Sequence, residues 1–180
     1  MNKLYEPSKF NIPTQYQPYS RASLDPQNAS TPETPPMTKV FEHAKLKFIY
    51  PENWTVIDSQ TEGSVCLNVS LQNEGTIQWT VYRYEGIHDT EELIAQATRA
   101  IHLEYQDHEE TEPYRQVIGE DVLNGRRMFF NYLDFILCMT ATTIYKDDAT
   151  YLFVVQAESN EYDENEVIFG ALAISLLSNA

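Results

Sequence analysis

The chain has 180 residues, of which 42% are hydrophobic and 12% aromatic, and it carries a formal net charge of −15 at pH 7. This length supports one full-sized hydrophobic core. Residues 41–180 hold 24 of the 27 acidic residues but only eight of the 12 Lys and Arg residues. Such a charge repels nucleic-acid phosphates and anionic lipid headgroups, and it either attracts basic proteins or only keeps the protein in solution.

Residues 1–40 differ in composition from the rest of the chain. They hold seven of the nine prolines, mixed with Ser, Thr, Gln and Asn. Proline removes backbone donors, and the few apolar residues cannot offset the entropy lost on ordering. We therefore predict a disordered tail over 1–40 and a folded domain over 41–180. The spaced aromatic residues of the tail, such as Tyr5 and Tyr16, either dock on a partner or on the domain, or belong to an unattached linker.

Alternating apolar residues predict four strands in the first half of the domain. Residues 45–50 and 55–59 predict the first two strands, separated by a turn at Pro51. The clearest alternation follows, with one apolar face formed by Val65, Leu67, Val69 and Leu71. After a turn at 73–75, residues 77–84 continue the same pattern, so these two strands form a hairpin.

A helical period replaces the alternation at residue 90. Asp89 and Glu92 have the spacing of a capping box. The apolar positions that follow form one stripe, made by Leu93, Ile94, Ala97, Ala100, Ile101 and Tyr105. We predict an amphipathic helix over 90–106 that packs on the sheet.

Further strands and a final helix are predicted beyond the acidic segment 107–113, which ends the first helix. Residues 114–122 return to a strand pattern, and Asn124-Gly125 is the strongest hairpin-turn signal. Residues 127–145 form either one long bent strand or two strands joined near 133–135. A turn at 146–148 leads to a strand over 150–157.

The last helix is predicted from the N-cap spacing of Asp163 and Glu166, which precede an apolar segment that reaches Leu176. It has little polar surface and should be mostly covered. The order of the elements indicates an α+β fold with an antiparallel sheet flanked by helices.

No catalytic, cofactor or metal motif is present. The glycines do not form a phosphate-binding loop, and neither H-E-x-x-H nor G-x-S-x-G occurs. Cys66 and Cys138 are too few for a disulfide scaffold or a zinc site. Both lie within strand patterns, where no helix N-terminus or basic neighbour lowers a thiol pKa. We expect two buried free thiols, no cofactor, no metal and no enzymatic activity.

Two sets of residues are candidates for contact with a partner. The first is the polar row of one predicted strand, formed by Gln78, Thr80, Tyr82 and Tyr84; these residues contact a partner, or they pack under a helix or in cross-strand pairs. The second is the basic pair Arg126-Arg127. It pairs with Glu120-Asp121 across the hairpin, or it anchors a carboxylate of a partner.

The location follows from the absence of targeting segments. No stretch approaches the roughly 20 apolar residues that span a bilayer, and residues 1–10 contain no apolar signal-peptide core. We expect a cytoplasmic protein without a signal peptide, lipobox or transmembrane segment.

The segment Phe41–Trp54, F-E-H-A-K-L-K-F-I-Y-P-E-N-W, begins an order of motifs that resembles a known family. It is followed by an antiparallel pair, a helix, the sequence L-N-G-R-R and the strand A-T-Y-L-F-V-V. This order is similar to that of the PsbP/Mog-like superfamily, including its bacterial DcrB-type branch, and covers residues 41–178. The resemblance implies an antiparallel sheet flanked by helices, and it implies binding or accessory roles, since it brings no catalytic motif with it.

Three functions follow from these observations. The first is a noncatalytic protein-binding or accessory module with a protein partner. The second is a small-ligand carrier or enzyme with a pocket between sheet and helix. The third is an acidic, immunity-type neutraliser of a basic effector. A deep apolar pocket would favour the second function, and a flat exposed patch would favour the first.

Overall fold

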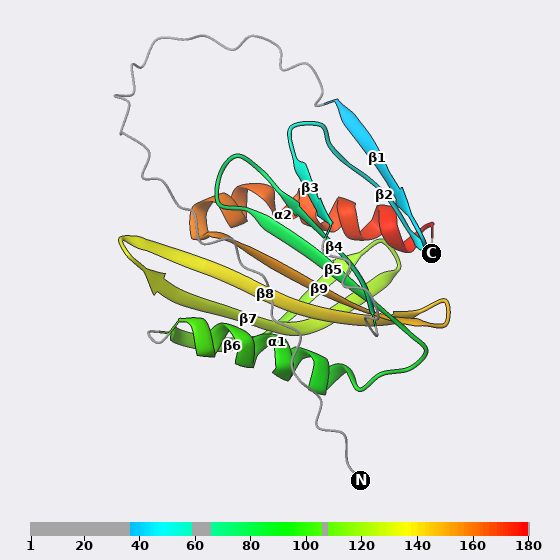
Figure 1. Cartoon of the computed structure of the whole chain (residues 1–180). Coiled ribbons are helices and arrows are strands. Elements are labelled where there is room, and N and C mark those ends of the chain that lie inside the picture. Colours follow the sequence, from blue (N-terminus) through cyan, green and yellow to red (C-terminus); the bar gives the residue numbers. More distant parts are fainter. Residues whose placement is uncertain (1–36, 59–65, 106–107, 180) are drawn as a thin grey trace. The chain divides into compact units, whose positions relative to one another are not determined.

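The computed structural model describes residues 37–58, 66–105 and 108–179 (Figure 1). Within these residues the chain forms nine strands and two helices: β1 Thr38–His43, β2 Leu46–Pro51, β3 Thr55–Asp58, β4 Cys66–Gln72, β5 Gln78–Glu85, α1 Thr90–Glu104, β6 His108–Ile118, β7 Asp121–Tyr132, β8 Phe135–Lys146, β9 Ala149–Glu158 and α2 Ser159–Leu177. The predicted α+β fold is confirmed. The predicted tail lies outside the described residues up to residue 36, and β1 begins three residues before the predicted start of the domain.

Seven strands form one antiparallel sheet in the order β3-β4-β5-β9-β8-β7-β6, while β1 and β2 form a separate hairpin. The last strand of the sequence, β9, therefore lies in the centre. It pairs with β5 on one side and with β8 on the other. The sheet thus consists of two runs of sequential strands, β3–β5 and β6–β8, which β9 joins.

Helix α1 packs on one face of the sheet, which we call the α1 face, over β7, β8 and β9. The Glu92 amide donates to Asp89 Oδ1 at 3.1 Å, so the predicted N-cap is confirmed. The apolar stripe is buried at Leu93, Ile94, Ala97 and Ile101. At the C-terminal end, the ring of Tyr105 lies 4.4 Å from that of Phe130.

Helix α2 and the β1–β2 hairpin lie against the opposite face, the α2 face (Figure 1). Trp79 is central to this core, with its ring 5.5 Å from Phe48 and 5.8 Å from Phe153. The predicted helix start was wrong, because Glu158 rather than Asp163 caps α2. Glu158 is the last residue of β9, and its carboxylate accepts hydrogen bonds from the backbone amides of Asn160 and Glu161.

The predicted turn at Asn124-Gly125 was also wrong. Both residues lie within β7, where Gly125 pairs with Tyr114 on one side and Thr142 on the other. A Cβ at Gly125 would lie 1.9 Å from the Ala141 carbonyl oxygen, so glycine is required here by the close approach of the neighbouring backbone rather than by a turn. The hairpin turn lies at Gly119-Glu120, and Gly119 supplies the positive φ of 60°.

The structure also corrects one strand prediction, decides between two alternatives for another segment, and shows that both faces of a third strand are covered. The segment 108–113, predicted to be a loop, belongs to the edge strand β6, in which charges and Pro113 are tolerated at a sheet edge. Residues 127–145 form two strands, since the chain turns between Tyr132 and Phe135. In β4 both faces are covered, because Ser70 is buried as well as Val69 and Leu71.

Candidate protein-contact site

The predicted polar row lies on the α1 face of β5. Its centre is closed, since Thr80 is only 4% exposed and its hydroxyl lies 2.8 Å from the hydroxyl of Ser70 on β4. Gln78, Tyr82 and Tyr84 are half-buried. Burial, followed by the neighbouring Tyr84, raises the pKa of Tyr82, so its phenol stays protonated. The row therefore offers neutral polar groups at a partly covered surface.

The predicted basic pair is divided between the two faces of the sheet, because successive side chains of a strand point in opposite directions. Arg126 points to the α1 face, where it shares one row across the sheet with Thr80 through Ala141 and Val154. Arg127 points to the α2 face. The structure thus places Arg126 on the same face as the polar row, three strands away from it.

Arg127 is held by side chains of β6 and α2. Its guanidinium lies 4.3 Å from the ring centre of Tyr114 and 5.4 Å from that of Tyr162, and its Nη2 donates to Glu166 at 3.3 Å. The Tyr114 hydroxyl donates to the same Glu166 oxygen at 2.7 Å. These cation–π and ionic contacts use the charge of Arg127 inside the fold.

The expected pairing of this basic pair with Glu120-Asp121 does not occur among the described residues. The turn of the hairpin lies at 119–120, so the residue opposite Arg127 is Glu112. Asp121 forms its ion pair with Lys146 of β8 instead. The pairing was expected because the turn had been placed five residues too late.

A shallow groove lies between α1 and the strands β6 and β7. Its volume is about 390 Å³, near the lower end of the range for ligand pockets. The helix and the two strands line it with Glu91, Ile94, Ala95, Thr98, Arg99, His102, Thr111 and Arg126. The groove is open to solvent and combines a small apolar floor with hydroxyl and cationic groups, which suits contact with a protruding chain more than enclosure of a small molecule.

Arg126 is exposed in this groove and forms no hydrogen bond or ion pair with any part of the chain that the structure describes. Arg99, from α1, lines the same groove and lies 3.6 Å from Glu92. Both side chains of that pair are more than half exposed. Exposed pairs of this kind are weak, so both arginines are available to an external group.

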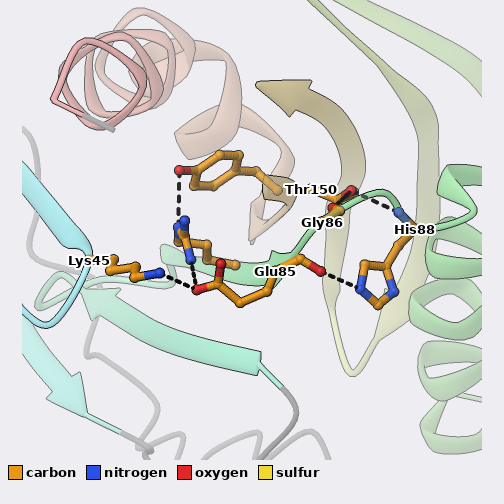
Figure 2. Close-up of polar contacts among 7 residues, drawn as sticks. Lys45, Glu85, Gly86, His88 and Thr150 are labelled. Atoms are coloured by element: carbon orange, nitrogen blue, oxygen red, sulfur yellow. Dashed lines mark hydrogen bonds and ion pairs between the residues drawn. The ribbon is translucent and has the colours of Figure 1, made fainter. Parts of the chain in front are cut away.

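A polar network on the α2 face surrounds Glu85 (Figure 2). Its carboxylate accepts from Lys45 Nζ at 2.9 Å and from Arg83 Nη1, and Arg83 Nε donates to the Tyr151 hydroxyl at 3.3 Å. The hydrogen bonds from Lys45 and Arg83 lower the pKa of Glu85. The network ties the β1–β2 turn to the end of β5.

The same strand end is fixed to the loop that leads into α1. The His88 amide donates to the Thr150 hydroxyl at 3.0 Å, and that hydroxyl donates to the Gly86 carbonyl at 2.8 Å (Figure 2). His88 Nε2 also donates to the Glu85 carbonyl at 3.0 Å. His88 is thus engaged in shaping the approach to α1, which supports one wall of the groove.

The thiol of Cys138 is not activated. Burial raises the pKa of Cys138 to about 12 in spite of the opposing charge of Arg127, so this thiol is protonated at neutral pH. Cys66 is half-buried and not in a disulfide. Within the described ranges, no group of three or more His, Cys, Asp or Glu side chains is placed to hold a metal ion. Neither described helix is long and apolar enough to cross a membrane.

Sequence reasoning found Arg126 but missed the residues of α1 that complete the groove. Glu91, Ala95, Thr98 and His102 follow one another at spacings of three and four, which places them on one stripe of the helix beside the buried apolar stripe. That stripe was readable in the sequence. Its position opposite Arg126 was not, because it depends on where α1 crosses the sheet.

Comparison with solved structures shows which fold this is. Cyanobacterial PsbP (CyanoP) from Synechocystis sp. PCC 6803 matches with a TM-score of 0.53 and 12% identity, over 84% of this chain and 98% of that chain. A protein from Bacteroides thetaiotaomicron VPI-5482 matches with a TM-score of 0.51 and 12% identity, over 77% of this chain and 47% of its own. The Ran-binding protein Mog1p of Saccharomyces cerevisiae has a TM-score of 0.46 at 11% identity, over 80% and 92% of the two chains.

The chain therefore has a PsbP-like fold, in agreement with the sequence resemblance. No protein-family model and no curated protein matches the sequence. The assignment to the bacterial DcrB-type branch stays a prediction. At identities near 12% the matches describe the backbone arrangement and assign no function to it.

Proposed function

We propose that the chain is a noncatalytic protein-binding or accessory module that contacts its partner through the α1 face. The observation that carries this proposal is the open groove at Arg126, whose charge has no partner among the described residues. In an acidic domain, Arg–carboxylate pairing within the chain is readily available, and Arg127 uses it. An arginine left exposed beside a groove is the kind of residue that anchors protein interfaces.

The chemistry of the titratable groups supports a binding role over catalysis. The buried Cys138 thiol is protonated, and Tyr82 and Tyr114 have raised pKa values that keep their phenols neutral. A nucleophile or general base needs a pKa matched to its task near neutral pH. These groups therefore act as hydrogen-bond donors and packing elements.

The proposed contact surface combines Arg126 with the polar row of β5. Gln78, Tyr82 and Tyr84 lie on the same face of the sheet and add half-buried amide and phenol groups. Tyrosine and arginine are both enriched at interface centres. Arg127, which lies on the other face and is engaged by Glu166, contributes to this surface only through the stability of β7.

Affinity capture from the source cells tests the proposal. The full-length wild type is compared with Arg126→Glu and with Lys47→Glu, a matched charge reversal on the β1–β2 hairpin. We expect a protein that is enriched by the wild type and by Lys47→Glu, and at least tenfold less by Arg126→Glu. Capture of nothing beyond the tag control contradicts the binding role, and equal capture by all three chains contradicts the surface.

The acidic neutraliser is the second candidate, favoured by the 24 acidic residues of 41–180. The same experiment separates the two. A captured partner that is strongly basic, and whose binding is unchanged in Arg126→Glu but lost in salt, would replace the first proposal with the second.

A further inference from the structure

The cations of the domain fall into two groups. All eight Lys and Arg residues of 41–180 lie in the described part of the chain, and six of them form an ion pair with an acidic side chain. The two without a pair are Arg115 and Arg126. Both are exposed. The domain has three times as many acidic as basic residues, yet these two arginines have no ion pair in the described chain.

Arg115 and Arg126 are neighbours on adjacent strands. In the strand register, Arg126 of β7 lies opposite Pro113 of β6, and Arg115 is two residues further along β6. Residues two apart on a strand share a face, so both side chains point to the α1 face in a diagonal cross-strand position. Like charges in such proximity are unfavourable. Neither guanidinium forms an ion pair with a carboxylate of the described chain.

Arg99 adds a third guanidinium from the helix side of the groove. We call Arg99, Arg115 and Arg126 the arginine patch. The groove beside it also presents the hydroxyls of Thr98 and Thr111 and an apolar floor that includes Ile94. Guanidinium groups have a planar fork of donors that matches a carboxylate or phosphate in a bidentate pair. The apolar floor suits the aliphatic part of a chain that carries such groups.

One acidic side chain, Glu91, also lines the groove. It lies eight residues before Arg99 on α1, or about 12 Å along the helix axis. The anionic group is therefore best accommodated at the Arg99–Arg126 end, away from Glu91. The weak Glu92–Arg99 pair, at 3.6 Å and exposed, is exchanged for a ligand carboxylate at little cost in free energy.

We propose that the arginine patch binds the carboxylates of a short, extended acidic segment of the protein partner. This inference rests on the proposed function and names the partner's chemistry. A long polyanion such as a nucleic acid is disfavoured because the remaining negative charge of the domain repels it along its whole length. A segment with a few carboxylates separated by aliphatic residues meets Arg99, Arg126 and the apolar floor within the groove, and it reaches Arg115 just beyond the lining residues on β6.

A titration monitored by NMR tests this inference on the full-length chain labelled with nitrogen-15. The probe is the peptide acetyl-Glu-Leu-Glu-Leu-Glu-amide, and its neutral control is acetyl-Gln-Leu-Gln-Leu-Gln-amide. The variants are Arg126→Gln and Arg115→Gln, with Lys47→Gln as the control that removes one positive charge elsewhere. The dispersion of the amide spectrum shows that each variant is folded.

We expect saturable shifts at the arginine side-chain Nε–H groups of the patch and at the amides of α1 and β7. Arg126→Gln should weaken the acidic peptide at least tenfold, Arg115→Gln should weaken it less, and Lys47→Gln should change it less than twofold. The neutral peptide should cause no saturable shift. Added salt should weaken binding, because the contact is ionic and exposed.

Four results overturn the inference. They are no shift with the acidic peptide, equal binding of the neutral peptide, equal weakening by Lys47→Gln, and tighter binding of inorganic phosphate or of a thymidine oligonucleotide at the same arginines. If the peptide does not bind but cellular capture still depends on Arg126, the inference that the partner segment is acidic is rejected. The proposed function then stands. If neither peptide binding nor cellular capture depends on Arg126, the proposed contact surface is rejected.

Discussion

Arg126 and Arg127 are adjacent in the sequence, yet they belong to different environments. On the α2 face, Arg127 lies against two tyrosine rings and an acidic side chain. On the α1 face, Arg126 is exposed in a groove with no partner in the described chain. The alternation of a single strand thus separates a cation with contacts inside the fold from an exposed cation without an ion pair in the described chain.

The two faces differ in the same way on a larger scale. The α2 face carries the main core and is closed by both α2 and the β1–β2 hairpin. Several of its polar groups form hydrogen bonds within the chain, as when Glu161 accepts from the Asn73 side chain and the Thr76 amide. Helix α1 covers β7 to β9 and leaves a groove along one side. The main core therefore lies on the α2 face, and the groove lies on the α1 face.

The largest expected effect of a substitution is therefore on the α2 face. Trp79→Ala should lower the free energy of unfolding by about 3–5 kcal/mol, because Trp79 is 1% exposed and contacts two other aromatic rings. Val117→Ala, at a 65% exposed position on the α1 face, should change it by less than about 0.5 kcal/mol. Urea unfolding measures both, and similar values for the two variants would break the comparison.

The arginine pair gives an intermediate effect. Arg127→Gln should lower the free energy of unfolding by about 1–3 kcal/mol, since it removes a partly buried charged hydrogen bond and two ring contacts. Arg126→Gln should leave it within about 0.5 kcal/mol and act on partner binding instead. Thermal and urea unfolding of both variants provide the measurement. A greater destabilisation by Arg126→Gln would assign the two residues to the opposite roles.

The smallest effect is expected at Glu85, whose carboxylate is exposed. Its pKa is lowered by Lys45 and Arg83, so the folded state binds the proton less readily than the unfolded state does. The resulting stability is present at neutral pH and is lost as the pH falls through the lowered pKa. Glu85→Gln should be slightly less stable than the wild type at pH 7, and the difference should be smaller at about pH 3, where more of the wild-type carboxylate is protonated. Urea unfolding at both values checks this, with Glu74→Gln as the control, and a difference that grows on acidification would contradict it.

Local patterns predicted most of the fold because they report local physics. The alternation from Val69 onward and the capping box at Asp89 depend on neighbours within a few residues, and both strand and helix were found. The separate strand β1 was missed, since its burial is slight and its pairing with β2 is what orders it. Val65, the first residue of the predicted alternation, lies outside the described residues.

The errors arose where one residue type serves two purposes. Asn124-Gly125 has the composition of a type I′ turn, but the glycine is needed for the close approach of β8. Paired positive φ angles, of 49° and 57°, occur instead at Asp147 and Asp148, in the predicted turn between β8 and β9, while β6 and β7 are joined at Gly119-Glu120. The site was only partly predictable for a similar reason. The alternation of side chains along a strand already places Arg126 and Arg127 on opposite faces. The approach of α1 to Arg126, by contrast, depends on the long-range pairing of β9 with β5.

The central position of β9 also bears on how the protein is made. Strand β5 is followed by more than sixty residues before its partner appears in the nascent chain. Until β9 has left the ribosome, β5 has one unpaired edge, and a second edge on β8 awaits the same strand. Sheets that depend on such distant pairing form slowly and expose aggregation-prone edges in the meantime. The two incomplete sheets, β3–β5 and β6–β8, therefore keep these edges open until β9 pairs with both of them.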